Sequence, residues 1–477
     1  MKINPYIFRN YDIRGLVPTD LNKTKVLAIA RAYGTFLQRR KVRQAVVGHD
    51  CRLSGKDFSK AFIKGLLETG VDVIDIGLAM TQMVYFSQYR FQVNGAAMIT
   101  ASHNPHNFNG FKLGTDFSRT TVSDEVQEIR KTTLTGKYFR PEKKGKVVKK
   151  DVEKYYKRDL LKRIRIKKKF KIVVDTRHGT AGEFAVQIFK EAGCKVVGIN
   201  LKVDGSFPKG TPDPTDERLM RELGERVLEE KADLGIMFDG DGDRVGMVDE
   251  RGRILWNDLL IALFSQEILE RFPGSKIIYN MLCSQVVSKV IKKMGGEGIM
   301  WLTGHSFIKD KIAEEEAVFG GELSGHFFFN DNFYGYDDGV YAALRVLEYL
   351  SQKKLSLSQI YDKLPKFISS PEIKIGCSDR AKKRVIKKLG EKLKKDFPKA
   401  KITDENVILG NDGVRVDFSD GMIVLRYSHN GPYLTIRFEA KKKEVYNRRK
   451  QYIKRALKKH KEIKWEDELG INLDSLA

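Results

Sequence analysis

Paired cysteines and long apolar runs are both missing from this chain of 477 residues. Its four cysteines (Cys51, Cys194, Cys283 and Cys377) lie far apart and form no C-x-x-C pair, which argues against a disulfide framework and against zinc. No run of about 18 uncharged apolar residues occurs, and the start MKINPYIFRN lacks the apolar core of a signal peptide. We therefore expect a cytoplasmic protein with no membrane segment.

Acidic residues are outnumbered by basic ones: the chain has 62 Asp and Glu against 87 Lys and Arg, so its net charge is +25. Such a charge can attract nucleic acid or anionic lipid. The lysine clusters at 143–150, 162–171 and 441–461 contain no recognisable RNA-binding or DNA-binding motif, however. We expect them to be solvated, with small molecules as partners and nucleic acid as the disfavoured alternative.

The pattern of apolar residues indicates several α/β units in series. Up to about residue 367, short apolar runs alternate with segments of helical period, such as residues 57–70, in which Phe58, Phe62, Ile63 and Leu66 share a face. From about residue 370, strand-like segments dominate, and they are followed by an amphipathic basic helix predicted over 445–457. Three α/β units and a smaller α+β unit are the simplest account.

A hydroxyl, an imidazole and an amide directly follow one apolar run, in the sequence AAMI-TASHNP at residues 96–105. The serine-hydrolase elbow G-x-S-x-G is absent here, so acyl transfer is a poor interpretation. Ser102 can instead carry a phosphate, with His103, Asn104 and Lys112 as donors to its oxygens. A purely structural serine is the alternative.

Three carboxylates alternate with glycines in a second loop, FDGDGDR at residues 238–244. Asp239, Asp241 and Asp243 would repel one another without a cation or protons, so the loop predicts a site for a hard cation such as Mg²⁺. Glu250 stands at position twelve of a possible EF-hand loop, but position six is Arg244 instead of glycine. The flanking segments also look like strands, so an EF-hand is strongly disfavoured.

Two further loops carry groups suited to a phosphorylated sugar. In FGGELSGHFFF at 319–329, Glu322 and Ser324 would face the same way in an extended loop and could bind neighbouring hydroxyls. In RYSHNGP at 426–432, a charged fork and neutral donors suit a terminal phosphate, and these are Arg426, Ser428, Asn430 and Gly431. A glycine-rich turn and a decorated hairpin are the respective alternatives.

The four loops together resemble the α-D-phosphohexomutase family, and most closely its phosphomannomutase/phosphoglucomutase branch. Members carry T-A-S-H-N-P, D-G-D-G-D-R, G-E-M-S-G-H and R-x-S-x-x-x-P in this order. YDIRG, NGFK, PDPT, TGHSFIK and DDGVYAA match as well, from about residue 8 to 440. The resemblance implies three related α/β domains with mixed sheets and a smaller α+β C-terminal domain around a central cleft. We place these domains at 1–148, 149–253, 254–367 and 368–477.

The resemblance implies an isomerase that interconverts the 1-phosphate and 6-phosphate of mannose, glucose or both. Phosphorylated Ser102 would donate its phosphoryl group, pass through a hexose 1,6-bisphosphate and recover the other phosphate. One Mg²⁺ would be held by Ser102, Asp239, Asp241 and Asp243. The implied catalytic residues are Ser102, His103, Lys112, Arg14, Arg244 and His326. The implied substrate-binding residues are Glu322, Ser324, His305, Lys309, Arg426, Ser428, Asn430, Gly431 and Arg437.

Some positions depart from the family pattern. Leu282 stands where relatives often have a substrate-binding lysine, which predicts weaker or shifted binding without loss of the chemistry. His49 and Cys51 are unusual fillers of V-G-x-D-x-R, and Asn430 replaces a common threonine. ELSGH at 322–326 favours glucose and mannose over glucosamine. A phosphoglucosamine mutase and a catalytically impaired sugar-phosphate-binding protein stay as alternatives, and we expect a monomer or weak homodimer.

Overall fold

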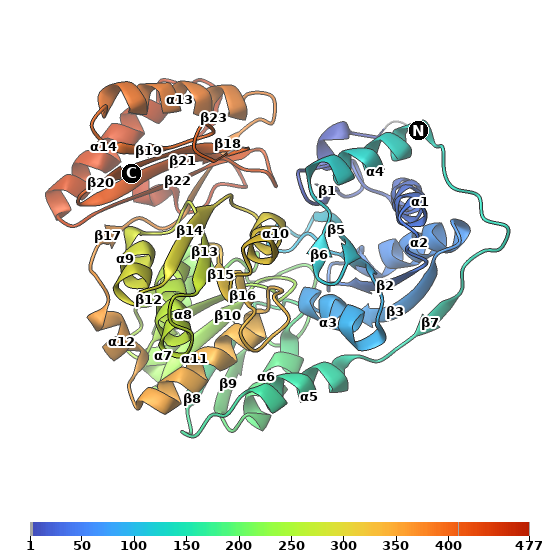
Figure 1. Cartoon of the computed structure of the whole chain (residues 1–477), viewed down its shortest axis with the longest axis horizontal. Helices are drawn as coiled ribbons and strands as arrows, with labels where there is room; N and C mark the ends of the chain where they lie inside the picture. Colours follow the sequence, from blue (N-terminus) through green and yellow to red (C-terminus); the bar gives the residue numbers. More distant parts are fainter. Residues whose placement is uncertain (1–2, 409, 477) are drawn as a thin grey trace. The chain divides into compact units, whose positions relative to one another are not determined.

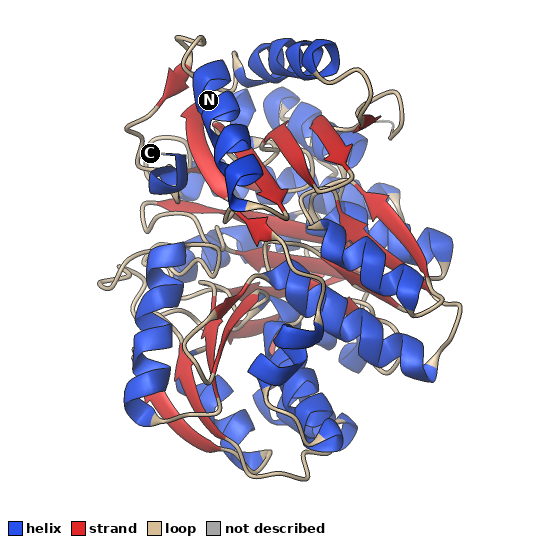
Figure 2. Cartoon of the chain, turned by 90° about the vertical axis from the view of Figure 1, so that its left-hand side faces the viewer, coloured by secondary structure: helices blue, strands red, loops and turns tan. Residues whose placement is uncertain are grey.

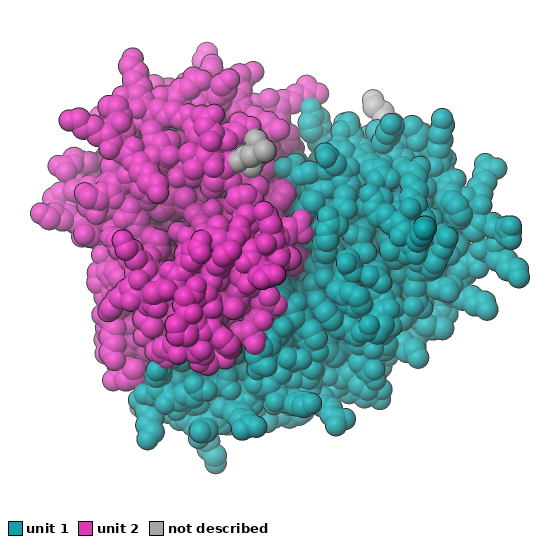
Figure 3. Space-filling view, viewed as in Figure 1, with its two compact units in different colours: residues 1–213, 226–245, 332–354 teal, residues 214–225, 246–331, 355–477 magenta. Residues whose placement is uncertain are grey.

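The computed structural model describes residues 3–408 and 410–476, and the chain divides into two compact units (Figure 3). Unit 1 comprises residues 1–213, 226–245 and 332–354, and unit 2 comprises residues 214–225, 246–331 and 355–477. Helix α7 (Glu217–Glu230) and strand β11 (Val245–Asp249) run across the boundaries of this division. Helices and strands alternate along most of the chain (Figures 1 and 2).

Unit 1 begins with a mixed sheet in the order β1-β5-β4-β2-β3-β7, with β6 paired to β5. The strands are β1 (Ile13–Leu16), β2 (Gln44–His49), β3 (Asp72–Leu78), β4 (Gly95–Ile99), β5 (Phe108–Asp116), β6 (Arg119–Thr120) and β7 (Val147–Lys149). Strand β2 pairs in parallel with β3 and β4, whereas β5 is antiparallel to β1 and β4. The helices are α1 (Lys23–Arg39), α2 (Gly55–Glu68), α3 (Thr81–Phe91), α4 (Ser123–Thr135) and α5 (Glu153–Arg163), after the short turn η1 (Pro5–Ile7).

The apolar residues that share a face in the sequence of α2 form part of the core beneath this first sheet. Helix α2 buries Phe58, Phe62, Ile63 and Leu66, as expected from their spacing. The ring of Phe62 lies 5.0 Å from that of Phe111 on β5 and 5.9 Å from that of Tyr33 on α1. These contacts tie both helices to the strand that follows the TASHNP loop.

A second α/β segment of unit 1 contains the parallel strands β8 (Lys171–Asp175), β9 (Lys195–Ile199) and β10 (Leu234–Phe238), in the order β10-β8-β9. Helix α6 (Gly182–Glu191) connects the first two strands. Strand β10 is wholly buried and ends just before the carboxylate loop. Helix α11 (Gly339–Lys353) completes the unit, with Asp338 as its N-cap.

Unit 2 contains the antiparallel pair of β11 and β12 (Ile254–Leu255) and a mixed sheet in the order β14-β13-β15-β16. The strands of that sheet are β13 (Lys276–Asn280), β14 (Glu297–Trp301), β15 (Phe319–Gly321) and β16 (Phe327–Phe329). Phe264 packs against the rings of Phe319, Phe327 and Phe329. The helices are α8 (Asn257–Arg271), α9 (Gln285–Lys293), α10 (His305–Glu315) and α12 (Leu357–Lys363).

The last part of unit 2 is an antiparallel sheet in the order β19-β20-β21-β22-β18-β23, with β17 paired to β22. Its strands are β17 (Ile368–Ser369), β18 (Ile373–Cys377), β19 (Lys401–Thr403), β20 (Gly413–Phe418), β21 (Gly421–Tyr427), β22 (Tyr433–Ala440) and β23 (Ile463–Lys464). Helices α13 (Lys382–Asp396) and α14 (Lys443–Leu457) share its apolar core, and η2 (Leu473–Leu476) follows. Helix α14 confirms the amphipathic helix predicted over 445–457.

The α/β class with a smaller α+β C-terminal part is confirmed, while the four domain boundaries stay predictions. Among the described residues, no helix has the length and apolar character needed to cross a membrane.

Candidate active site

Ser102 lies in the loop that follows β4, in contact with the carboxylate loop. Its side chain is wholly buried, and its Oγ donates a hydrogen bond of 2.7 Å to Oδ2 of Asp239. The Nδ1 of His103 lies 3.1 Å from the same Oγ. The backbone φ of Ser102 is +50°, in the left-handed region that residues other than glycine seldom adopt, and which occurs often at functional sites. The fold therefore brings together the two loops that the sequence predicted to cooperate.

The three carboxylates form a buried cluster with the donor set of a hard-cation site. Asp239, Asp241 and Asp243 are wholly buried, and each offers one oxygen within 4.8 Å of the others. Within the described parts of the chain, Oδ1 of Asp241 is buried without a hydrogen-bond partner, so this oxygen could serve as a ligand to a cation. All-oxygen coordination suits Mg²⁺. Strands β10 and β11 flank the loop, which confirms that it is no EF-hand.

Lys112 of β5 balances part of this charge. Its Nζ lies 2.8 Å from Oδ2 of Asp241 and also contacts Asp243. Burial alone would lower the pKa of Lys112, but Asp241 and Asp243 outweigh burial and raise it. Burial and the neighbouring carboxylates raise the pKa of Asp239 well above its usual range. Burial would raise the pKa of Asp241, yet the ammonium of Lys112 outweighs burial and holds the pKa of Asp241 below the usual range. Added positive charge would relieve this repulsion, and a divalent cation is one group that supplies it.

Two threonines that sequence reasoning missed also hold the cluster. Thr81, the first residue of α3, donates from Oγ1 to Oδ2 of Asp241 over 2.6 Å. Thr100 donates to the same oxygen over 3.1 Å. Thr100 begins the TASHNP motif and could have been suspected, but no short motif marks Thr81.

Two arginines predicted to be catalytic lie beside this cluster. Arg14 of β1 donates from Nη1 to Oδ1 of Asn104 over 2.8 Å, and its Nε pairs with Asp12. Nε of Arg244 lies 3.9 Å from Oδ2 of Asp239. Unit 1 thus gathers Ser102, His103, Lys112, Arg14, Arg244 and the three carboxylates at one place.

The loop between β15 and β16 is the glycine-rich turn that the sequence left open as an alternative to an extended segment. In residues 322–325, Gly325 N donates to Glu322 O over 3.0 Å. Gly325 permits this reversal with a φ of +98°. The side chain of Glu322 is buried and accepts from Gly304 N over 2.7 Å, while Ser324 is half-buried. The spacing argument for a shared face, which holds only for an extended backbone, therefore does not apply to Glu322 and Ser324.

The start of α10 connects this turn with the loop at residues 426–432 inside unit 2. The ring of His305 lies 5.5 Å from that of His326, and Lys309 follows one turn later on α10. The ring of Phe307 meets His429 edge-on at 5.8 Å. Segments from two domains of the predicted plan therefore contact each other.

The loop after β21 is organised by a buried acid. Arg426 pairs with Asp412, and Nε2 of His429 lies 2.8 Å from Oδ2 of the same carboxylate. Burial opposes the charge of Asp412, but the Arg426 guanidinium and His429 hold its pKa far below the usual range. Oγ of Ser428 accepts from the backbone N of Asn430 over 3.0 Å.

Lys382 fixes the other side of this loop. Its Nζ donates to the carbonyl oxygens of Ser428 and Gly431 over 2.7 and 2.9 Å. Arg437 lies elsewhere, buried and paired with Asp258 over 2.7 Å. Leu282 is buried as well. The substrate-binding roles predicted for Arg437 and for the other residues of unit 2 stay predictions.

Four models from one protein family match successive parts of the chain. They describe the three alpha/beta/alpha domains and the C-terminal domain of phosphoglucomutase/phosphomannomutase, and they match residues 5–139, 152–252, 256–367 and 372–456. The chain belongs to this family. A phosphomannomutase/phosphoglucomutase of Pseudomonas putida is 37% identical over 434 residues, which are 91% of each chain. A phosphoglucomutase of Neisseria gonorrhoeae is 34% identical and covers 96% of this chain and 98% of its own.

A solved structure of a family member from Burkholderia thailandensis has a TM-score of 0.85 and 33% identity, over 96% of this chain and 98% of that one. The family assignment and the fold class predicted from the sequence are confirmed. As a member of the family the chain is a phosphohexomutase, and therefore an isomerase. The glucosamine-specific and impaired alternatives are not favoured.

Proposed function

We propose that this phosphohexomutase interconverts the 1-phosphate and 6-phosphate of mannose, glucose or both, with Ser102 as the phosphoryl carrier. The observation that carries the proposal is the hydrogen bond from the buried Oγ of Ser102 to Asp239, inside a cluster of three carboxylates. A serine in this place can exchange a phosphoryl group with a substrate hydroxyl, beside the positive charge of Lys112 and of a cation held by the carboxylates.

The proposed cycle conserves phosphate. The bond between phosphorus and Oγ of phosphorylated Ser102 breaks as the free hydroxyl oxygen of the hexose monophosphate binds phosphorus, and that hydroxyl loses its proton. The product is a hexose 1,6-bisphosphate, whose other phosphoryl group then returns to Oγ of Ser102. Lys112 and His326 are the proposed groups for proton transfer. Arg14, His103 and Arg244 bind the oxygens of the Ser102 phosphate.

One Mg²⁺ is the proposed cofactor, held by Asp239, Asp241, Asp243 and an oxygen of the Ser102 phosphate. The all-carboxylate donor set and the unpartnered Oδ1 of Asp241 support it. When bound, the ion offsets negative charge on the transferring phosphoryl group.

Residues of unit 2 are proposed to bind the parts of the substrate that do not react. Glu322 and Ser324 hold the third and fourth sugar hydroxyls, with His305 and Lys309 nearby. Arg426, Ser428, Asn430, Gly431 and Arg437 hold the phosphate that is not transferred, so binding at one end orients the other. Glucose and mannose differ at the second hydroxyl, which this pair does not contact, so we propose that both are substrates.

Covalent labelling tests the proposal directly. Intact-mass analysis after mixing with glucose 1,6-bisphosphate should show one phosphate on the wild-type protein, on Ser102, and none on Ser102→Ala. Ser102→Ala should lose nearly all mutase activity. Ser87→Ala is the matched control, because Ser87 is also buried in unit 1 but its hydroxyl donates to Met83 O of its own helix α3. Full activity in Ser102→Ala, or a competent wild type that never carries the phosphate, would overturn the proposal.

Side-by-side assays of mannose, glucose and glucosamine 1-phosphates decide the sugar. Turnover of both mannose and glucose phosphates is expected, and activity confined to glucosamine phosphate contradicts it. We further propose a cytoplasmic monomer or weak homodimer without a nucleic-acid partner. The four free cysteines support a reducing compartment. Light scattering across a concentration series tests the oligomeric state.

A further inference from the structure

Arg52 is a buried arginine in the loop between β2 and α2, outside the residues assigned above. Its side chain and that of its ion-pair partner Asp50 are both wholly buried, with Nε lying 3.2 Å from Oδ2 of Asp50. Parallel pairing of β2 with β4 sets His49 opposite Ile99. Residues 50–52 and the Ser102 loop therefore leave the sheet at the same edge.

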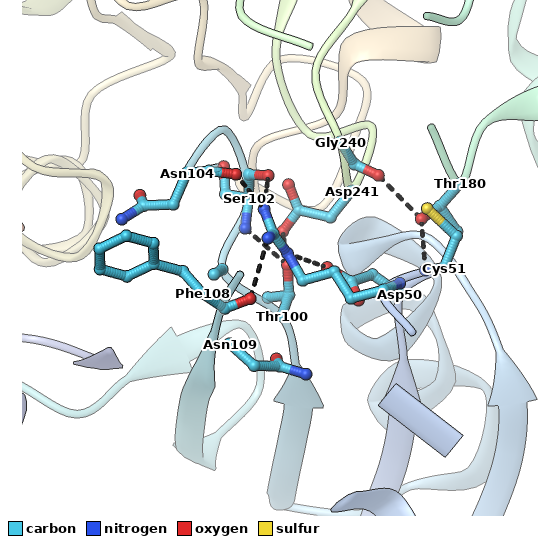
Figure 4. A network of polar contacts seen from close by, with 12 residues as sticks. Asp50, Cys51, Thr100, Ser102, Asn104, Phe108, Asn109, Thr180, Gly240 and Asp241 are labelled. Carbon is cyan, nitrogen blue, oxygen red and sulfur yellow. Dashed lines mark hydrogen bonds and ion pairs between the residues drawn. The ribbon is translucent and has the colours of Figure 1, made fainter. Parts of the chain in front are cut away.

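The four remaining donors of the guanidinium all bind carbonyl groups of the Ser102 loop and the start of β5. Nη2 donates to the carbonyl oxygens of Ser102 and Asn104 over 2.7 and 2.6 Å. Nη1 donates to those of Pro105 and Phe108 over 2.6 and 2.9 Å. Figure 4 shows Ser102, Asn104 and Phe108 in this network beside Asp50. One side chain thus fixes both ends of the seven-residue segment 102–108.

Residues 50–52 also connect to the carboxylate loop. The backbone N of Cys51 donates to Oγ1 of Thr180, and that hydroxyl donates to the carbonyl of Gly240 over 2.8 Å (Figure 4). A Cβ added at Gly240 would lie 2.5 Å from the carbonyl oxygen of Ser102, the oxygen that Arg52 also binds. Residues 50–52 therefore connect the two loops whose contact defines the site.

This arrangement answers a conformational problem. Ser102 adopts a φ of +50°, which costs free energy and persists only when its surroundings enforce it. Buried carbonyl groups need donors, and a planar guanidinium offers five in a rigid fork. The ammonium of a lysine concentrates its donors at one point and cannot span four carbonyls and a carboxylate.

We propose that Arg52 is a positioning residue for phosphoryl transfer, which holds the Ser102 loop in the conformation that sets Oγ against Asp239. It contacts no substrate and acts only through the loop backbone. The proposal rests on the proposed role of Ser102 as the phosphoryl carrier.

The test compares Arg52→Lys and Arg52→Gln with wild type and with Arg449→Lys. Arg449 is a matched control, because it is also buried and binds a carbonyl oxygen, that of Glu439, and the side chain of Asp420. For each protein, melting temperature, kcat and KM for glucose 1-phosphate are measured. Rapid quenching and intact mass then give the rate at which Ser102 gains phosphate from glucose 1,6-bisphosphate.

We expect Arg52→Lys to fold and to lose about tenfold to 100-fold in both kcat and the labelling rate, because misplacement of a reacting group by about 1 Å has effects of this size. KM should stay within about threefold, since the substrate-binding residues of unit 2 keep their contacts. Arg52→Gln should lose more. Arg449→Lys should melt at a lower temperature with kcat and the labelling rate unchanged.

Among folded proteins, three outcomes overturn the proposal: wild-type labelling by Arg52→Lys, a rise in KM alone, or an equal loss of kcat in Arg449→Lys. Failure of both Arg52 variants to fold would assign Arg52 to the fold alone and would also overturn it. If the wild type itself never gains phosphate on Ser102, the proposed function fails instead, so the two failures are distinguishable.

Discussion

The ammonium nitrogen of Lys112 lies 2.8 Å from Oδ2 of Asp241 and also contacts Asp243, so a lysine of β5 pairs with two of the three buried carboxylates. Removing one partner of a buried ion pair leaves uncompensated charge and costs about 3 to 5 kcal/mol. A divalent cation would offset the same charge.

Lys112→Met should therefore make the stability of the protein depend strongly on metal. We expect a large fall in melting temperature in EDTA and a much smaller fall in excess Mg²⁺. The matched control is Lys382→Met, which removes a buried lysine paired with Asp379 in unit 2, and it should lower the melting temperature equally in both buffers. An equal, metal-independent fall in Lys112→Met would contradict a cation site at the carboxylates.

Gly240→Ala should separate the two loops of unit 1. The added Cβ would meet the carbonyl oxygen of Ser102 at 2.5 Å, and backbone atoms cannot yield as a flexible side chain does. We expect activity to fall by about 100-fold or more in a folded protein, because Ser102 and Asp239 move apart. Gly390→Ala is the control, since its Cβ meets Val414 at 3.4 Å and alanine favours helix α13. Equal activities of the two variants would disprove the close approach.

Asp412→Asn should weaken the hold on Arg426 and so impair phosphate binding more than turnover. We expect KM for glucose 1-phosphate to rise about tenfold, which is about 1.4 kcal/mol, with a smaller effect on kcat. Steady-state kinetics measure both. Asp396→Asn, which alters an acid paired with Lys392 on α13, should leave KM unchanged. A loss of kcat at constant KM would argue against a binding role for this loop.

The free energy of unfolding should fall as pH rises, because of one buried acid of unit 1, Asp338. Burial raises the pKa of Asp338 to about 7, although it accepts from Tyr156 OH over 2.7 Å and caps α11 through Tyr341 N. The folded state then binds a proton that the unfolded state releases near pH 4, so the free energy of unfolding declines from about pH 4 to 7.

Asp338→Asn keeps an acceptor oxygen but cannot ionise. Relative to wild type, its free energy of unfolding should therefore rise between pH 5 and pH 8, by on the order of 1 to 3 kcal/mol. Urea denaturation of both proteins at the two pH values measures the difference. A constant difference would show that Asp338 ionises normally in the folded state.

The parts of the site that could be predicted are those whose chemistry is local in sequence. Alternating glycines and aspartates at 239–243 form a tight acidic loop suited to a cation, and Ser102 follows an uninterrupted apolar run typical of a buried strand. Arg52 and Thr81 were missed because their partners lie 50 to 160 residues away. Four of the five hydrogen bonds of the Arg52 guanidinium go to backbone carbonyls, which carry no sequence signal.

The sequence left the shape of the loop at Glu322 open between an extended segment and a glycine-rich turn. The spacing of Glu322 and Ser324 implies a shared face only if the backbone is extended, and the positive φ of Gly325 reverses the chain instead. Glycine in a sequence permits both conformations, so the pattern alone could not choose between them. The strands β10 and β11, by contrast, follow from uninterrupted apolar runs around the carboxylate loop.

The edge-on contact between Phe307 and His429 has a consequence for altering this enzyme. Helix α10 carries Phe307 between His305 and Lys309, whereas His429 shares a carboxylate with Arg426. Mutation near α10, where His305 and Lys309 are proposed to bind the sugar, would shift the aromatic surface against which the loop at 426–432 rests. On the proposed roles of the two segments, sugar preference and phosphate affinity should therefore co-evolve in laboratory lineages, with compensating changes accumulating at position 429.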